Sequence, residues 1–252
     1  MRLVSYFAGV GLITCLIIAC ALPFGVAACW QSRARNWRLF SLVGASLLTQ
    51  IAVTNLPPIN GFRHLHWHWQ ACLLSVVLVL LLVRLVPAVS LTSIGVTSRL
   101  RRGWLKPSII ALLIAVAVPA VFFALGSRVK LTTEGWIYLS LMPGLAEELV
   151  FRGVIQSLLN RVFPRSWYVA GARCGWGLVI TAVLFAGANG LVDVDAQLHP
   201  RIILHAGIAP LLMSLVSGWV RERSDSIWPS VVGHNLSNLV IPGASICARL
   251  VH

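Results

Sequence analysis

Two adjacent glutamates, Glu147 and Glu148, lie inside the apolar run of residues 136–160. A charged side chain at the centre of a bilayer costs at least about 2.5–3.5 kcal/mol, so intramembrane carboxylates usually have a function. Arg152 follows Glu148 by four residues, a spacing that puts both side chains on one helix face. We therefore expect Arg152 to hold Glu148 ionised, while Glu147 stays free to activate water as a general base. The alternative is a structural ion pair between packed helices.

A second polar group lies in the last apolar run, residues 226–243. His234 and Asn238 are four residues apart and share a helix face. An imidazole and an amide side by side can donate two hydrogen bonds to one oxygen, as an oxyanion hole does. Asn235 is rotated off this face and is the less suitable amide. The alternative is a histidine that only satisfies a neighbouring backbone carbonyl.

The composition indicates which elements must position these residues. The chain has 252 residues, of which 58% are hydrophobic and 11% charged, whereas soluble domains carry about 25% charged residues. This excludes a disordered chain, a secreted disulfide scaffold and an ordinary cytosolic enzyme. The six cysteines lie in apolar stretches without a C-x-x-C pair, which favours buried packing residues over zinc or redox sites.

The hydrophobic pattern predicts an all-α polytopic membrane protein, a single integral-membrane domain over residues 1–252. A helix needs about 20 apolar residues to cross the hydrocarbon core. Eight segments qualify, over residues 3–29, 39–55, 70–90, 108–126, 136–160, 174–189, 201–220 and 226–243. The last four are richer in Gly, Pro, His and Asn, so we expect the functional site among them. Ile17 to Cys20 also resembles a lipoprotein cleavage site, but we expect the first helix to be retained.

The basic residues predict an orientation in the membrane. The chain carries 20 Lys and Arg against 7 Asp and Glu, a net charge of +13. Twelve Lys and Arg lie in the loops after the first, third, fifth and seventh segments, and four in the other loops. The positive-inside rule then places both termini outside the cytoplasm. Short basic clusters between apolar runs suit anionic lipid headgroups, and no nucleic-acid motif is present.

The motifs A-E-E-L-V-F-R-G over residues 146–153 and the stretch from Gly218 to His234 resemble the CPBP intramembrane protease family. This family includes the CAAX prenyl endopeptidases and bacterial proteins linked to bacteriocin self-immunity. The resemblance covers residues 108–243, and residues 1–107 contain no recognisable motif of the family. It implies a glutamic-type protease in which Glu147 is the base, Glu148 with Arg152 is a structural pair, and His234 with Asn238 stabilises the oxyanion.

The middle motif departs from the family. The family has F-x-x-x-H, whereas this chain has Phe185 followed by Asn189. Asn can hold a water molecule but cannot accept its proton at neutral pH. Either Glu147 is the sole base, or His205 substitutes, or the chain is a pseudoprotease. An older view of the family uses zinc, but a single well-placed intramembrane His favours a metal-free site, because catalytic zinc usually takes three protein ligands.

The other five acids are predicted to be solvated loop charges; they are Glu134, Asp193, Asp195, Glu222 and Asp225. Asp193 and Asp195 have a second interpretation, as residues that cap or hinge a loop over the site. Three histidines alternate with aromatic residues at His64, His66 and His68. As a strand they would form a metal site, and as a loop they form part of an interfacial belt, which we favour.

The sequence as a whole predicts an intramembrane endopeptidase in a bacterial inner membrane, without a cofactor. Its partners would be the lipid bilayer and a membrane-anchored protein or peptide substrate, such as a precursor with a processing signal, a prenylated tail or a bacteriocin. The sequence does not indicate an oligomeric state. Two other classes remain open: a non-enzymatic immunity or scaffold protein that binds a peptide in the same cavity, and a small transporter.

Overall fold

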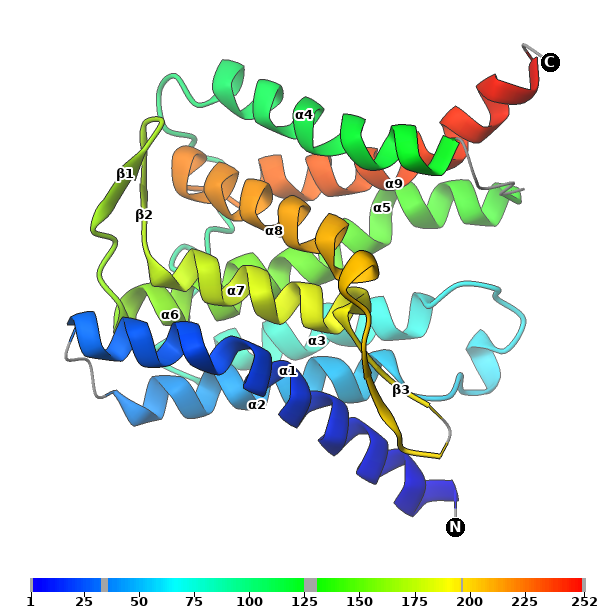
Figure 1. The fold of residues 1–252 in the computed structure, drawn as a ribbon, viewed down its shortest axis with the longest axis horizontal. Helices are drawn as coiled ribbons and strands as arrows, with labels where there is room; N and C mark the ends of the chain where they lie inside the picture. The colour runs from blue at the N-terminus through cyan, green and yellow to red at the C-terminus, as the bar shows by residue number, and fades with distance from the viewer. Residues whose placement is uncertain (1, 33–35, 125–130, 196, 251–252) are drawn as a thin grey trace.

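The computed structural model is mostly helical and describes residues 2–32, 36–124, 131–195 and 197–250 (Figure 1). Each of the eight segments predicted from hydropathy contains a helix. The main helices, which lie side by side along the long axis of the molecule, are α1 (Arg2–Ser32), α2 (Trp37–Thr54), α3 (Trp69–Leu85), α4 (Leu105–Ala124), α5 (Thr133–Glu148), α7 (Trp176–Ala186), α8 (Leu204–Ser224) and α9 (Trp228–Leu250).

Two helices of the described chain, over Tyr6–Gln31 and Trp37–Thr54, are long and apolar enough to cross a membrane. Shorter apolar helices occupy Trp69–Leu85, Leu105–Ala117 and Trp176–Leu191. Large aliphatic side chains such as Leu81, Leu85, Leu113 and Ile114 are exposed on the outer faces of the bundle. An extensive exposed apolar surface of this kind suits contact with lipid rather than water.

Two π-helical segments interrupt the helices at the places where polar residues cluster. The segment η2 (Leu149–Ile155) separates α5 from α6 (Gln156–Val162), and η3 (Gly187–Leu191) ends α7. The predicted segment 136–160 therefore contains α5, η2 and α6 in succession. The widened turns of a π-helix are rare and occur frequently at functional sites. In η3 the chain also leaves helical geometry at Asn189 and at Gly190, whose φ of 124° suits glycine.

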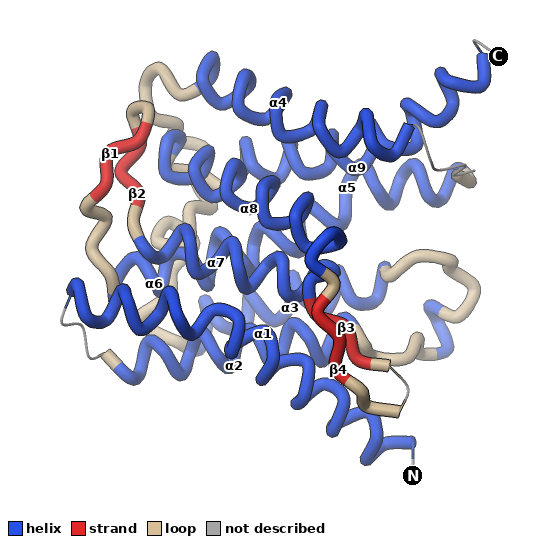
Figure 2. Tube along the Cα trace, viewed as in Figure 1, coloured by secondary structure: helices blue, strands red, loops and turns tan. Residues whose placement is uncertain are grey.

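Two short antiparallel hairpins lie at opposite ends of the bundle (Figure 2). Strands β1 (Trp167–Val169) and β2 (Ala172–Cys174) pair with Trp167 opposite Cys174. Strands β3 (Val192–Val194) and β4 (Pro200–Ile202) pair with Val192 opposite Ile202. The sixth and seventh predicted segments thus each begin in a strand, and a 3₁₀ turn, η1 (Asn60–Phe62), lies between α2 and α3.

The core of the bundle surrounds η2. Phe151, Val154 and Ile155 are almost fully buried there, and α5 packs against α9 while α7 packs against α8. The N-terminal helix belongs to this core: Ile17 is fully buried, and a Cβ added at Gly187 would lie 2.8 Å from its side chain. The helix α1 therefore contributes to the same packed unit as the later helices.

Glu222 differs from its prediction as a solvated loop charge, because α8 continues to Ser224, four residues past the predicted end. Its carboxylate is buried at the junction of α6 and α8. It accepts hydrogen bonds from Gln156 Nε2 at 2.7 Å and Asn160 Nδ2 at 2.6 Å. Arg165 Nη1 lies 2.8 Å from the other carboxylate oxygen and supplies the opposite charge. A buried charge needs such partners, so Glu222 joins two helices.

The contact of α5 with α9 depends on Gly144, whose N–H donates to Asn235 Oδ1 at 2.8 Å. A Cβ at this position would lie 2.5 Å from Asn235 Oδ1 and 2.7 Å from the Val231 carbonyl oxygen. We expect Gly144→Ala to destabilise the protein by about 1–3 kcal/mol, the usual cost of overpacking a tight contact. The measurement is the thermal unfolding midpoint of detergent-purified protein.

Gly44→Ala on α2 is the matched control for this prediction, because an added Cβ there meets no atom within 4 Å. Alanine favours a helix over glycine by about 1 kcal/mol, so this variant should unfold at or slightly above the wild-type temperature. Equal midpoints for the two variants would contradict the tight contact at Gly144.

Candidate functional site

Glu147, in the last turn of α5, faces a polar cavity of about 170 Å³. The cavity lies between α1, the last turns of α2, and η3 with β3. Its lining residues are Ile13, Gln50, Ile51, Thr54, Asn55, Glu147, Phe151, Ala188, Asn189, Val192 and Asp193. Glu147 Oε2 is buried and, within the described part of the chain, has no hydrogen-bond partner. A carboxylate in this state is available to bind a water molecule or another proton donor.

Glu148 points away from this cavity into the packed interior. Its Oε2 lies 3.0 Å from Arg152 Nε, and both side chains are fully buried. The ion pair predicted from the four-residue spacing is therefore present. The second carboxylate oxygen lies 2.9 Å from His234 Nδ1 on α9, a contact that the sequence did not indicate. The adjacent glutamates thus have different surroundings, one neutralised by a cation and one facing a cavity.

The contact with Glu148 determines how His234 presents its ring. An ionised carboxylate only accepts hydrogen bonds, so the 2.9 Å contact requires a proton on Nδ1. Nε2 is then the nitrogen left for the site: it is an acceptor in the neutral ring and a donor in the imidazolium. The carboxylate therefore fixes both the tautomer and the orientation of the ring, as a partner of a catalytic histidine does.

Phe185 connects these groups from α7. The Arg152 guanidinium carbon lies 4.4 Å from the centre of the Phe185 ring, a cation–π contact. The ring of His234 meets the same phenyl ring in a T-shaped arrangement, with centroids 6.0 Å apart. Phe185 was considered from the sequence only as the first residue of the middle motif. In the structure it holds Arg152 and His234 in place around Glu148.

Asn189, the last residue of the middle motif, lines the same cavity as Glu147 and lies beside its carboxylate. Its Nδ2 donates to the Phe185 carbonyl oxygen at 3.1 Å, closing the π-helical turn. The irregular backbone of η3 therefore brings the amide to the cavity wall. An amide at this place can hold a water molecule next to Glu147 by hydrogen bonds.

Three residues considered from the sequence are not among the residues that line the Glu147 cavity: His234, Asn238 and His205. Asn238 is half-buried one turn beyond His234 on α9 and does not line the cavity. His205 is exposed in the first turn of α8 and does not line it either, so His205 does not replace the missing motif histidine. The distance follows from β4, which carries the chain away from η3 before α8 begins.

Several cavity residues were not found from the sequence. Gln50, Thr54 and Asn55 come from the end of α2, in the region where no family motif was recognised. Asp193 of β3 lines the cavity, as its second interpretation, a residue over the site, suggested; it is nevertheless an exposed side chain. Isolated Gln, Thr and Asn residues at a helix end carry no local signal that distinguishes a cavity wall from a cap.

The histidine-rich segment does not form the strand that a metal site would need. It lies in turns and bends between η1 and α3. Glu134 Oε1, at the start of α5, accepts from the His66 backbone N–H and from Trp69 Nε1, each at 3.1 Å. Glu134 Oε2 also lies 3.1 Å from His66 Nδ1. The segment is thus a loop held against α5, and Glu134 is more than a solvated charge.

The donor groups at the site do not fit a zinc ion. Glu148 is committed to Arg152, and His234 Nδ1 is committed to Glu148. Within the described ranges of the chain, no three His, Cys, Asp or Glu side chains converge as a metal site would require. Catalytic zinc usually takes three protein ligands, so no step of the chemistry is assigned to a metal here.

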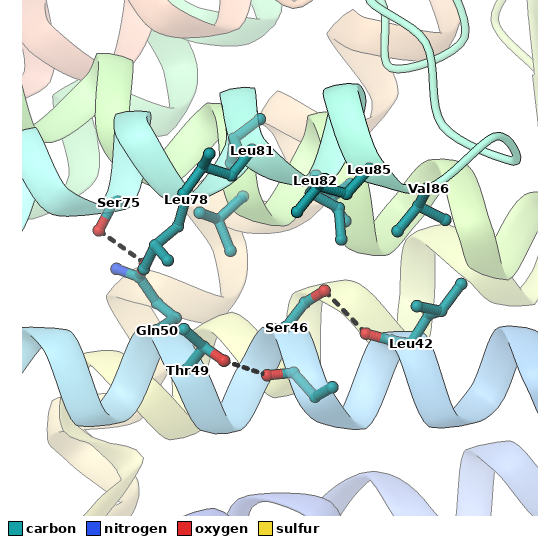
Figure 3. Close-up of a pocket in the computed structure, with 14 residues that line it drawn as sticks. Leu42, Ser46, Thr49, Gln50, Ser75, Leu78, Leu81, Leu82, Leu85 and Val86 are labelled. Carbon is teal, nitrogen blue, oxygen red and sulfur yellow. Dashed lines mark hydrogen bonds between the residues drawn. The ribbon is translucent and has the colours of Figure 1, made fainter.

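A larger, mostly apolar groove of about 310 Å³ lies between α2 and α3. Figure 3 shows Leu82 and Leu85 of α3 facing Leu42 and Ser46 of α2 across it. Gln50, which accepts a 2.8 Å hydrogen bond from Ser75 Oγ, lines both this groove and the Glu147 cavity. The groove thus adjoins the polar cavity through one side chain.

The apolar helical bundle is that of an integral membrane protein, and it encloses a buried cluster of Glu148, Arg152 and His234. Residues 128–240 match the family model described as Type II CAAX prenyl endopeptidase Rce1-like. The resemblance recognised from the sequence is therefore confirmed, and with it the assignment as an integral membrane protein. No curated protein and no solved structure matches the chain.

Proposed function

We propose that the chain is an intramembrane endopeptidase of the glutamic type, which hydrolyses a peptide bond of a membrane-anchored protein or peptide. One observation carries the proposal: within the Rce1-like region, Glu147 presents an unpartnered carboxylate oxygen to a polar cavity, while its neighbour Glu148 is neutralised by Arg152. Proximity to Glu148 and burial make Glu147 suited to proton transfer rather than to a structural ion pair.

In the proposed reaction, Glu147 takes a proton from a water molecule that Asn189 helps to hold. The water oxygen forms a bond with the substrate carbonyl carbon, and the carbonyl oxygen becomes an oxyanion. Glu147 then passes the proton to the amide nitrogen, and the carbon–nitrogen bond breaks to give a carboxylic acid and an amine. No metal takes part.

The oxyanion is assigned to His234 and Asn238, which share one face of α9. Because Nδ1 already donates to Glu148, Nε2 donates to the oxyanion only when the ring is an imidazolium. Glu148 stabilises that cation directly, so its contact with His234 of α9 has a role in the reaction in addition to its ion pair with Arg152. Asn238 lies one turn further along α9 and outside the cavity lining, so it supplies the second donor only if α9 shifts toward the cavity when substrate binds.

We place the protein in a bacterial inner membrane with both termini outside the cytoplasm. The start of α1 and the end of α9 lie at the same end of the bundle (Figure 1), as a bundle with an even number of crossings requires. The loops rich in Lys and Arg lie at the other end, which the positive-inside rule assigns to the cytoplasm.

A second candidate function is a non-enzymatic membrane protein that binds a peptide in the same cavity. Asn189 favours it, because the Asn189 amide cannot accept a proton and His205 does not reach the site. In this case Glu147 would serve as a hydrogen-bond acceptor for the bound peptide.

Mass spectrometry of membrane-protein termini distinguishes the two functions. We expect termini that are present in cells with the wild-type chain and missing in cells without it, and these termini name the substrate. Activity of the purified protein on that substrate should persist in a chelator. A loss phenotype without any change in termini would favour the binding protein and contradict the protease.

A further inference from the structure

The two ends of the bundle differ sharply in charge. Among the described residues, the loops and adjoining helix ends beside the β1–β2 hairpin hold ten Lys and Arg residues against Glu222 and Asp225. Both of these acids are already paired, Glu222 with Arg165 and Asp225 with Arg101. The ten basic residues are Arg38, Arg99, Arg101, Arg102, Lys106, Arg161, Arg165, Arg173, Arg221 and Arg223.

The opposite end, which carries the β3–β4 hairpin, is close to neutral (Figure 2). Its described loops hold two arginines, Arg63 and Arg201, and it also carries three acids, Glu134, Asp193 and Asp195. The start of α1 and the end of α9 lie at this end and add one arginine each. A difference of this size between the two ends is what the positive-inside rule uses to orient a membrane protein.

The Glu147 cavity opens toward the nearly neutral end. Thr54 and Asn55 line it from the last turn of α2, and Asp193 lines it from β3, which Figures 1 and 2 place away from the β1–β2 hairpin. Asp193 is exposed, so the cavity reaches the surface at this hairpin. No Lys, Arg or His side chain is among the described lining residues.

Packed side chains separate Glu147 from the basic end. The chain runs from Glu147 toward that end through η2 and α6, where Phe151, Arg152 and Ile155 are almost fully buried. One turn further, Gln156 and Glu222 form the buried hydrogen-bonded junction of α6 and α8. These packed groups close the direct route along η2 and α6, whereas the apolar groove between α2 and α3 borders the cavity at Gln50.

We infer that the Glu147 cavity opens on the extracytoplasmic face of the membrane, and that its substrate is the extracytoplasmic, juxtamembrane segment of a membrane-anchored protein. The substrate part of this inference rests on the proposed protease function, whereas the sidedness of the cavity does not. If the cavity opens on the extracytoplasmic face, peptide tails that lie in the cytoplasm do not reach Glu147, whether or not they are prenylated.

Cysteine labelling in intact cells tests the sidedness. Asp193→Cys marks the mouth of the cavity and Arg173→Cys marks the exposed hairpin at the basic end. Each is made in a chain whose native cysteines are replaced by alanine and is treated with a membrane-impermeant maleimide. We expect at least a tenfold excess of label on Asp193→Cys in intact cells, and labelling of Arg173→Cys only after the membrane is permeabilised.

The reverse pattern overturns the inference, and so does equal labelling of the two positions in intact cells. If the cysteine-free chain does not accumulate, the same two substitutions are compared in the wild-type background, with the unsubstituted chain as the blank. Because labelling needs no peptide cleavage, it decides the sidedness even if the protease function fails. If the protease function holds, cleavage sites in cytoplasmic segments of the substrates would also overturn the inference.

Discussion

A Glu147→Gln variant is expected to cleave its substrate about 10²–10⁴-fold more slowly than the wild type, the range that a general base contributes. Glutamine keeps the shape of the side chain but cannot take a proton from water. The structure leaves no other described carboxylate in the interior of the cavity, because Glu148 faces Arg152 and His234, and Asp193 is at the mouth. The measurement is the initial rate of purified protein on a substrate identified from its termini.

Asp225→Asn is the matched control for this variant. It makes the same change of carboxylate to amide, but at a half-buried residue that pairs with Arg101 at the basic end. Asp225 has a φ of 60°, a conformation that asparagine also tolerates. Its rate should equal that of the wild type. A Glu147→Gln protein that cleaves as fast as this control would remove Glu147 from the role of base.

The prediction succeeded where local sequence determines structure. Runs of apolar residues indicate helices, and each of the eight predicted segments contains a helix in the structure. The helix ends differ from the predicted bounds by several residues. The Glu148–Arg152 pair follows from a four-residue spacing on one chain segment, and the structure confirms it. Asn189, singled out as the last residue of the middle motif, lines the cavity together with Glu147.

The remaining contacts join residues far apart in the sequence, and spacing gives no signal for them. His234 meets Glu148 across 86 positions because α9 packs against α5, and nothing local to either residue specifies that pairing. Glu222 was predicted to be a solvated loop charge because the polar end of α8 resembles a loop in composition. In the structure its carboxylate accepts hydrogen bonds from α6 and pairs with Arg165. Hydropathy identifies a helix but does not indicate which helix will lie beside it.

The residues that line the cavity also could not all be identified from the sequence. The site was predicted among the last four segments, yet Ile13 of α1 and the end of α2 complete the cavity around Glu147. The family match begins at residue 128, so these helices lie outside it. Polar residues near the end of an apolar helix are ordinary at a membrane interface, and only the three-dimensional arrangement shows that they border a carboxylate.

Arg152→Met is expected to destabilise the protein by about 3–5 kcal/mol, because removing one partner of a buried ion pair leaves the other charge uncompensated. Methionine fills most of the space of the arginine stem, so the change mainly removes the charge. Glu148 is fully buried and would keep only its contact with His234, while Phe185 would lose the cation above its ring. The measurement is the unfolding midpoint of the purified protein in detergent.

Two double variants identify which carboxylate Arg152 neutralises. In Glu148→Gln/Arg152→Met the buried charge is gone, and the amide oxygen can still accept from His234 Nδ1, so most of the lost stability should return. In Glu147→Gln/Arg152→Met the charge on Glu148 remains, so the protein should stay as unstable as the single variant. Arg152 Nε contacts Glu148 at 3.0 Å, and Glu147 faces the cavity instead. Equal recovery in the two double variants would contradict that division, and with it the assignment of one glutamate to structure and the other to proton transfer.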